Sequence, residues 1–340
     1  MEPEAPLTLA ERLAQAAGRG GVVDLTPLSG GRNNRVFRVA TADGAPLLLK
    51  LYHSDRRDPR DRLGQEWAFV TYAWARGLRQ IPKPLACDHE AHAGLYSFAP
   101  GRKLAADEVT AARVDQALDF VLAVNAPPRG FDALPLGSEA CFALKDHIAT
   151  IHGRVARLQG LDAGGPCGGE AERFVRERLT PAWVSAKASL TRGAARLGLS
   201  LNQQIAAKAV CLSPSDFGFH NALADGDALT FIDFEYAGRD DPAKLASDFF
   251  CQPDIPVPAA LYDRFVDGLA AGLKLAPIDA ERCRLLLDAY RVKWACILLN
   301  DFLPLGSARR AFAAQPCSEE RRRRQIHRAE RMLSQIASQP

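Results

Sequence analysis

The fold is decided by one stretch of the sequence, CLSPSDFGFHNALADGDALTFIDFEYAG, residues 211–238. Asp216 and Asn221 stand in it in a D-x-x-x-x-N spacing, on a loop before a predicted strand, and Asp233 ends the strand that follows. The Asp-Gly-Asp sequence at residues 225–227 predicts a tight hairpin turn between the two strands. Because a hairpin folds the chain back, we expect Asp233 to lie near Asn221, with Asp216 across the floor of a cleft.

The order of these three residues matches what phosphoryl transfer needs. A carboxylate must orient the attacking hydroxyl and accept its proton, and oxygen ligands must hold magnesium on the nucleotide. Taken separately, Asp216 and Asn221 are ordinary turn residues and Asp233 is a strand-end residue. As an ordered set, downstream of the two features described next, they favour a catalytic site.

The first upstream feature is a glycine-containing turn. The sequence SGGRNNRVFRV, residues 29–39, places Gly30, Gly31 and Asn33 between two predicted strands. Glycines there would let backbone N–H groups approach a phosphate closely. A plain hairpin turn is the simpler explanation of a lone glycine pair, so the prediction of a phosphate lid depends on what accompanies it.

The second upstream feature is a lysine inside an apolar strand. Lys50 lies in LLLKLY, where burying an unpaired ammonium would be costly. Either the side chain snorkels to water from an edge strand, or it points into a cleft and grips nucleotide phosphates while pairing with a carboxylate. Glu66 is the natural partner, because it is the only acid beyond the first turn of the helix predicted over residues 58–77.

The arrangement of predicted elements indicates two lobes. The first hundred residues mix short strand patterns with one helix, and the pattern changes after Gly101. Beyond it, long amphipathic segments separated by loops with Pro and Gly predict helices, interrupted by the hairpin. The sequence therefore predicts an α+β fold: a small β-rich nucleotide-binding lobe over residues 1–101, which ends in a hinge, and a larger helical lobe over residues 102–340 with the catalytic loop and the acceptor site.

These motifs, over residues 28–250, resemble the aminoglycoside phosphotransferase and choline kinase-like superfamily, whose fold is similar to that of eukaryotic protein kinases. The resemblance implies that Asp216 is the catalytic base and that Asn221 and Asp233 bind Mg²⁺. It also implies that Lys50 contacts the α- and β-phosphates while Glu66 holds Lys50. The hinge residues that would hydrogen-bond the adenine of ATP, or the base of GTP, through their backbone are Ser97, Phe98 and Ala99.

The triplet Asp216-Phe217-Gly218 spells the metal-binding DFG of protein kinases, but we interpret the match as a coincidence. If Asp216 bound the metal, a D-x-x-x-x-N pair would have to lie upstream. The upstream stretch LTRGAARLGLSLNQQIAAKAV, residues 190–210, is predicted to be helical and offers none. The metal-binding aspartate is therefore expected at Asp233.

Two positions depart from the family pattern. The family usually has a histidine two residues before the catalytic aspartate, and here Pro214 stands there, with Ser213 or Ser215 as partial substitutes. The family also tends to have an aspartate where this chain has Leu245, and Asp248 is a weaker candidate for supporting the catalytic loop from another register.

Composition limits the class of protein. The 340 residues are 47% hydrophobic and 24% charged, which is ordinary for a globular protein and argues against disorder. A formal charge of +3 is too small to indicate a nucleic-acid partner, and no run of about 18 apolar residues predicts a membrane span. The eight cysteines are single and the amino terminus is no signal peptide, so we expect a cytoplasmic protein.

The acceptor is only partly constrained by sequence. Residues 101–317 carry nearly equal numbers of acidic and basic residues, which argues mildly against a polycationic aminoglycoside. The candidate acceptor-binding residues are Arg239, Asp240, Arg291, Lys293 and Trp294. The last three could instead belong to a core helix whose basic residues face water, whereas the sharper interpretation is a patch that binds a sugar or an anionic small molecule. The basic helix predicted from residue 318 onward is interpreted as a solvated face.

We therefore expect an enzyme that transfers the γ-phosphoryl group of ATP, or of GTP, to a hydroxyl of a small molecule, with Mg²⁺ on the phosphates. Sugars, amino sugars and amino alcohols remain open as acceptors, and the oligomeric state is not indicated. The alternative is a pseudokinase, a binding or scaffolding protein with the same fold, which Pro214 would favour. A protein kinase is disfavoured because no long activation loop ending in Ala-Pro-Glu follows Asp233.

Overall fold

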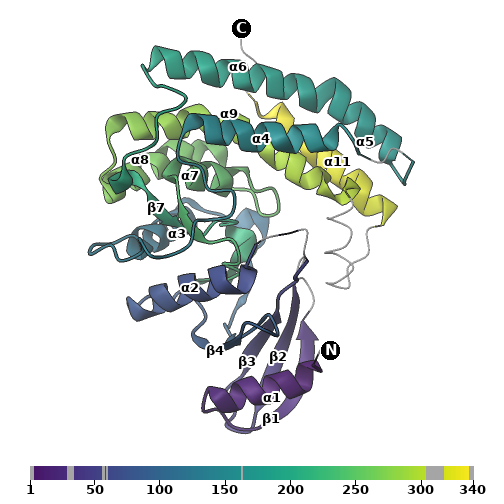
Figure 1. The fold of residues 1–340 in the computed structure, drawn as a ribbon, viewed down its shortest axis with the longest axis vertical. Helices are drawn as coiled ribbons and strands as arrows, with labels where there is room; N and C mark the ends of the chain where they lie inside the picture. The colour runs from purple at the N-terminus through teal and green to yellow at the C-terminus, as the bar shows by residue number, and fades with distance from the viewer. Residues whose placement is uncertain are drawn as a thin grey trace.

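The computed structural model describes residues 4–28, 34–55, 58, 60–161, 164–303 and 318–336. The chain forms two lobes, with a small sheet at one end and a larger helical body at the other (Figure 1). This arrangement confirms the predicted α+β, two-lobed fold.

The small lobe is built on one antiparallel sheet with the strand order β1-β2-β3-β5-β4. Short apolar or alternating sequences form its strands, as expected for a sheet with one face packed against the core. A helix, α1 (Pro6–Ala16), covers the outer face, and its Leu9 and Leu13 are buried there. The strands are β1 (Val22–Leu28), β2 (Arg35–Thr41), β3 (Leu47–Leu51), β4 (Pro84–Asp88) and β5 (Ala93–Ser97).

Helix α2 (Arg62–Ala75) joins the small lobe to the core of the large one. The Asp61 carboxylate caps its first turn by accepting from the Gly64 N–H at 2.9 Å. On its buried face, Phe69 stacks on Phe234 with ring centroids 4.5 Å apart, and both belong to the larger hydrophobic cluster. Movement of α2 is therefore coupled by packing to the segment that carries Asp233.

The large lobe is a helical body arranged around α9, which packs against α4, α6, α7, α8 and α11 (Figure 1). Two small sheets are set into it, β6-β8-β9 and β10-β7. Its helices are α3 (Ala111–Val124), α4 (Leu144–Leu158), α5 (Gly168–Phe174), α6 (Thr180–Arg196), α7 (Pro242–Cys251), α8 (Tyr262–Leu273), α9 (Pro277–Leu298) and α11 (Glu319–Ser334). Its strands are β6 (Arg102–Lys103), β7 (Cys211–Ser213), β8 (Ala222–Asp225), β9 (Ala228–Phe231) and β10 (Gly238–Asp240).

The predicted hairpin is confirmed, and one predicted helix is partly wrong. Strands β8 and β9 pair in register across the 225–227 turn. The helix expected over residues 190–210 ends at Arg196, because Gly198 adopts a positive φ of 69° that stops it. Most of the rest of that stretch is irregular, and it still carries no alternative catalytic pair.

The predicted lobe boundary, Gly101, lies between β5 and β6. Gly101 has φ +106°, and a Cβ atom there would lie 2.6 Å from the carbonyl oxygen of Ala224. A side chain is therefore excluded at this point by both backbone conformation and contact.

Aromatic rings support the catalytic loop from within the large lobe. Phe217, which follows Asp216, packs against Phe231 at 5.0 Å and Phe249 at 5.2 Å between ring centroids. Phe120 packs against Phe217 at 5.8 Å and against Phe231 at 4.7 Å between ring centroids. Burying such rings is strongly favourable, so the backbone of the loop is anchored one residue after the predicted base.

We expect Phe217→Ala to destabilise the protein by about 3–5 kcal/mol, because it removes a buried ring at the centre of this cluster. The matched control is Val184→Ala, at an exposed position of α6, which should change stability by about 0.5 kcal/mol or less. Urea unfolding measures both. Equal losses in the two variants would show that Phe217 does not anchor the loop.

Candidate active site

Lys50 and Glu66 form the predicted pair. The Lys50 Nζ atom, on β3, lies 2.6 Å from Glu66 Oε2, on α2, and both side chains are buried. Burial alone would lower the pKa of Lys50, but the carboxylates of Asp233, Glu66 and Glu235 outweigh it and hold that pKa well above its usual range. Lys50 is therefore charged, as its predicted role in phosphate binding requires.

Glu66 is held in place by two further contacts. Its Oε2 atom accepts from the hydroxyl of Tyr52 at 2.8 Å, and its Oε1 atom accepts from the backbone N–H of Phe234 at 3.2 Å. Since Phe234 directly follows Asp233, the same carboxylate orients Lys50 and fixes the backbone beside the predicted metal ligand.

Asp233 lies at the same cluster. Its Oδ1 atom is 2.5 Å from Lys50 Nζ, and its side chain is partly exposed. The residue adopts a positive φ of 68°, which a non-glycine residue rarely does and which often marks a functional position. Ile232, just before it, donates its N–H to the Asn221 carbonyl at 2.9 Å, so the hairpin places Asp233 beside Asn221 as predicted.

Asn221 and Asp233 carry side-chain oxygen atoms of the kind that Mg²⁺ prefers as ligands. The Asn221 side-chain nitrogen donates to the backbone carbonyl of Asp216 at 3.0 Å, which leaves the amide oxygen as the atom able to bind a metal. In the part of the chain that the structure describes, no group of three or more His, Cys, Asp or Glu could hold a metal by itself. Two protein ligands suit a magnesium ion that is bound together with substrate phosphates.

Asp216 ends a strained turn. Ser215 before it has φ +53°, and its N–H donates to the hydroxyl of Ser213 at 3.1 Å. This bond closes the turn around Pro214, the position where the family usually has a histidine. Ser213, one of the two substitutes considered, therefore does stabilise the turn that presents Asp216.

Sequence reasoning missed His220. Its Nε2 atom lies 3.4 Å from Asp216 Oδ1, and its carbonyl accepts from Lys103 Nζ at 2.8 Å. Because residues four apart meet in a helical turn, the spacing of Asp216 and His220 on a short turn was the available signal.

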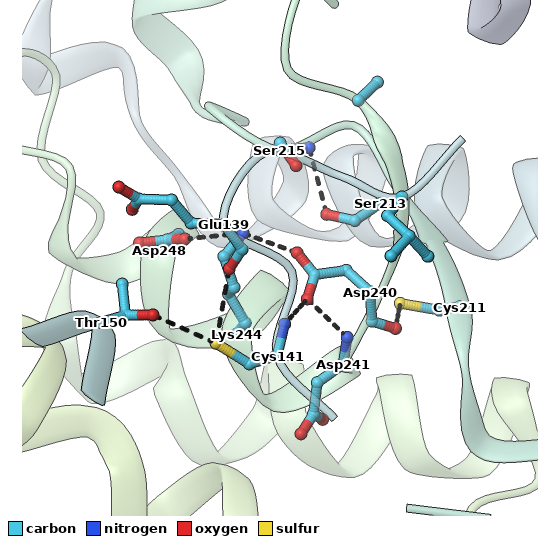
Figure 2. Close-up of polar contacts among 12 residues, drawn as sticks. Glu139, Cys141, Thr150, Cys211, Ser213, Ser215, Asp240, Asp241, Lys244 and Asp248 are labelled. Carbon is cyan, nitrogen blue, oxygen red and sulfur yellow. Dashed lines mark hydrogen bonds and ion pairs between the residues drawn. The ribbon is translucent and has the colours of Figure 1, made fainter. Parts of the chain in front are cut away.

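Asp240 was predicted to bind the acceptor, and the structure instead places it inside the protein. It is fully buried, and it accepts from the N–H groups of Cys141 at 3.0 Å and Asp241 at 2.8 Å and from Lys244 Nζ at 2.6 Å (Figure 2). Strand β10, which carries it, pairs with β7, which leads into the catalytic loop. Asp240 therefore supports the loop from behind.

Asp240 and Ser215 both lie against Gly137. A Cβ atom on Gly137 would lie 3.2 Å from the Ser215 hydroxyl oxygen and 3.3 Å from Asp240 Oδ2. Figure 2 shows Asp240, Lys244 and Asp248 grouped below the Ser213–Ser215 turn. The charge network and the turn are thus neighbours.

Lys293 and Trp294 are also buried rather than available to an acceptor. Lys293 Nζ lies 2.9 Å from both oxygens of Asp248, and the Trp294 indole N–H donates to Asp248 at 2.8 Å. Lys244 reaches the same carboxylate at 3.7 Å. Asp248 therefore contributes to the network behind the loop, whereas the predicted substrate role of Lys293 and Trp294 conflicts with their burial.

The remaining two residues predicted to bind the acceptor, Arg239 and Arg291, differ in their surroundings. Arg239 lies on β10 and donates to the Leu134 carbonyl at 2.9 Å, so it is partly occupied by the neighbouring loop. Arg291 pairs with Asp288 at 2.5 Å and lines a cavity of about 240 Å³ in the large lobe, between α9, α11 and the loop that follows α7.

Two of the backbone N–H groups that were predicted to contact the nucleotide base are already hydrogen-bonded within the protein. The Ser97 N–H donates to the Lys83 carbonyl at 2.9 Å and the Phe98 N–H donates to the Pro46 carbonyl at 3.2 Å. Within residues 97–99, the N–H of Ala99 is thus a better candidate for contact with a base than those of Ser97 and Phe98.

The glycine turn, with Gly30, Gly31 and Asn33, lies outside the described residues. The adjoining Asn34 is buried: its side-chain nitrogen donates to Glu235 at 2.6 Å and its oxygen accepts from the His53 N–H at 3.2 Å. The bond from Asn34 to Glu235 links the residue that follows the glycine turn to the segment after Asp233. No sequence pattern near Asn34 predicted this contact.

A second buried ion network lies at the start of α7. The Asp241 carboxylate caps α7 by accepting from the Ala243 N–H at 2.8 Å, and it also contacts Arg282 and His147 Nε2, the latter at 3.1 Å. Burial alone would lower the pKa of His147, but hydrogen bonding to Asp241 outweighs it and raises the pKa to about 9.

The comparisons agree with this geometry. The sequence matches the phosphotransferase enzyme family over residues 24–286. Among solved structures it is similar to a spectinomycin phosphotransferase in complex with ADP and spectinomycin, with a TM-score of 0.60, 12% identity and coverage of 98% of each chain. It is also similar to a choline kinase from Streptococcus pneumoniae, with a TM-score of 0.60, 12% identity and coverage of 96% of this chain and 98% of the other.

A choline/ethanolamine kinase family protein from Mesorhizobium loti has 18% identity and a TM-score of 0.56, with coverage of 96% of this chain and 98% of that one. No curated protein matches the sequence significantly. Within the described residues, no helix is long and apolar enough to cross a membrane.

The protein is therefore a phosphotransferase with a protein-kinase-like fold. It belongs to the phosphotransferase enzyme family, which agrees with the resemblance that the sequence motifs show.

Lys50 and Glu66 should behave as a coupled pair. Lys50→Met leaves the buried Glu66 carboxylate without its cation and should cost about 3–5 kcal/mol of stability. The double variant Lys50→Met/Glu66→Gln should be more stable than Lys50→Met alone, because the unpaired charge is removed. Chemical unfolding of the two single variants and the double variant measures the coupling, and strictly additive losses would contradict it.

The raised pKa of His147 makes stability depend on pH in the alkaline range. A base whose pKa is raised on folding stabilises the fold below its ordinary pKa, and that contribution is lost as the pH rises through about 9. We expect the free energy of unfolding to fall by about 2 kcal/mol from this group between about pH 7 and pH 10. His147→Gln should flatten the profile in urea unfolding, and parallel profiles for the two proteins would contradict the assignment.

Proposed function

We propose that this enzyme transfers the γ-phosphoryl group of ATP, or of GTP, to a hydroxyl of a small molecule, with Asp216 as base and Asn221 and Asp233 as magnesium ligands. The observation that carries the proposal is the joint contact of Lys50 with Glu66 and Asp233, beside Asn221 and Asp216. Groups far apart in the sequence are brought together in the order that phosphoryl transfer uses.

Lys50 would bind the donor phosphates. In this structure its ammonium is held between two carboxylates, and the contact with Asp233 is the one that a metal ion and phosphates would replace. Bound Mg²⁺ would neutralise charge on the phosphates, with Asn221 and Asp233 as its protein ligands. Glu66 would keep Lys50 in position.

Asp216 would orient the acceptor hydroxyl and take its proton. The acceptor oxygen then bonds to the γ-phosphorus while the bond from that phosphorus to the bridging oxygen of ADP breaks. Most of the rate acceleration in such a site comes from positioning and charge stabilisation. The anchored Phe217 and the Ser213–Ser215 turn support this role because they fix the backbone on either side of Asp216.

A cytoplasmic location is part of the proposal. It is supported by the cysteines, of which those in the described residues, seven in all, are free of disulfides. A reducing compartment is the simplest environment for cysteines that form no disulfides.

We expect Asp216→Asn to lower kcat by about a hundred- to ten-thousand-fold, the usual range for a general base. The melting temperature should stay nearly unchanged, because the side chain is partly exposed to solvent. Asp227→Asn, in the exposed hairpin turn, is the matched control and should keep wild-type activity. ADP release with Mg·ATP and a responsive acceptor measures both variants, and full activity of Asp216→Asn would remove it from the base role.

The alternative is a pseudokinase, which Pro214 favours. The two functions differ in whether Mg²⁺ matters: an active site of this design should bind ATP more tightly with Mg²⁺ and show added thermal stabilisation. Binding of ATP without any effect of Mg²⁺, together with no ADP release, would favour the pseudokinase.

A further inference from the structure

His220 lies beside the proposed base, and its surroundings fix its position. Its Nε2 atom is 3.4 Å from Asp216 Oδ1, and only 15% of its side chain is exposed. Its backbone carbonyl accepts from Lys103 Nζ at 2.8 Å. The preceding residue, Phe219, is fully buried and packs against Phe249 with ring centroids 5.5 Å apart. The backbone of His220 is therefore anchored on both sides of the contact, and its mostly buried ring lies against the carboxylate.

Gly218 leaves the space that the imidazole occupies. A Cβ atom at this position would lie 2.8 Å from His220 Nδ1 and 2.8 Å from Gln252 Cγ, which is closer than a side-chain carbon approaches such atoms. The φ of Gly218 is 172°, an extended conformation that any residue adopts, so glycine is needed here for space and not for backbone freedom. The loop is thus shaped to admit this ring beside Asp216.

The surroundings of the ring decide which nitrogen atom carries the proton when the imidazole is neutral. Nδ1 is buried, and among the described residues it has no hydrogen-bond partner. A buried N–H group without an acceptor is rare and costly, so we expect the proton on Nε2, the atom that faces Asp216. His220 therefore presents an N–H donor to a carboxylate oxygen.

The carboxylate of Asp216 needs such a partner. Pro214 has no side-chain donor, and the Ser213 hydroxyl acts on the backbone, where it accepts from the Ser215 N–H at 3.1 Å. Rotation of an aspartate carboxylate about its last torsion is soft, so a fixed backbone does not by itself fix the carboxylate. At 3.4 Å the contact with His220 is longer than the roughly 2.7–3.2 Å of a well-formed hydrogen bond, and catalytic hydrogen bonds often shorten to that range only when substrates bind.

We propose that His220 is a positioning residue for Asp216: its Nε2–H donates to Oδ1 and holds the carboxylate in the orientation that receives the proton of the acceptor hydroxyl. From four residues after the aspartate, it supplies a side-chain donor that Pro214 cannot. The inference rests on the proposed phosphotransferase function and adds one residue to it. Because orientation of the reacting groups is a large part of the rate acceleration, the loss of this donor should appear in kcat.

The test compares His220→Leu with His220→Gln. The two new side chains are similar in size, but only glutamine carries an N–H donor. We expect His220→Leu to lower kcat about ten- to a hundredfold, the loss expected for one hydrogen bond to a charged group, with the KM for ATP nearly unchanged. His220→Gln should recover most of that loss. ADP release with Mg·ATP and a responsive acceptor measures both variants.

The matched control is His327→Leu on α11. His327 is exposed, and its Nδ1 atom lies 3.4 Å from Glu330 Oε2, so this substitution removes a histidine–carboxylate contact of the same length outside the site. The control should keep wild-type activity. The melting temperature of His220→Leu should stay close to that of the wild type, which shows that its lost activity does not come from unfolding.

A double-mutant cycle separates positioning of the base from general support of the fold. If His220 acts through the Asp216 carboxylate, adding His220→Leu to Asp216→Ala should change kcat by less than about twofold. Losses that multiply in the double variant would overturn the inference. Wild-type activity of His220→Leu, or equal losses in the leucine and glutamine variants, would overturn it as well.

A spectroscopic measurement keeps the failure of this inference distinct from that of the proposed function. With the imidazole nitrogens labelled with ¹⁵N, the protein at about pH 8.5, where an ordinary histidine is neutral, should show His220 with its proton on Nε2. Asp216→Ala should change that signal, and its absence from His220→Leu assigns it. A proton on Nδ1, or a signal that Asp216→Ala leaves unchanged, would overturn the positioning role in an active enzyme. No ADP release with any acceptor would instead overturn the proposed function and with it the catalytic role of the contact, while the spectrum would still report the contact itself.

Discussion

The rest of the site depends on one interaction, the pairing of the Lys50 ammonium with two carboxylates. It contacts one carboxylate from α2, Glu66, and one from the chain after β9, Asp233. A buried ammonium is stable only with such partners, so the small lobe, α2 and the large lobe must meet at this point. Glu66 strengthens the arrangement because its second oxygen holds the Phe234 N–H, and Phe234 in turn stacks on Phe69 of α2.

The catalytic loop is stabilised from behind by packing and buried charge. Phe217 anchors the loop among aromatic rings, and Ser213 closes the turn where the family usually has a histidine. Beneath the turn, Lys244 lies between the carboxylates of Asp240 and Asp248 (Figure 2). A buried charge network fixes its members when every charge has a partner. These contacts can therefore order the loop that carries Asp216, although Pro214 stands where the family usually has a histidine.

Charge in the large lobe is distributed unevenly. Acidic and basic residues of the large lobe are nearly balanced in number, yet α9 and α11 direct three arginines to one cavity. Coulomb interactions at a few ångströms outweigh those of distant, screened surface charges.

The sequence by itself determined the two-lobed fold, the Lys50–Glu66 pair and the hairpin that brings Asp233 beside Asn221, because strand patterns, turn residues and the cost of a buried lysine are local or nearly local constraints. The sequence could not decide which charged residues of α7, β10 and α9 are buried and which are accessible to a ligand. Asp240, Lys293 and Trp294 were predicted to bind the acceptor and are buried, whereas Arg291 reaches the cavity. The contact of His220 with Asp216 and that of Asn34 with Glu235 also came only from the tertiary structure. The physical reason is that the direction of a polar side chain in a helical lobe depends on partners distant in sequence, and only packing of the whole lobe brings those partners together.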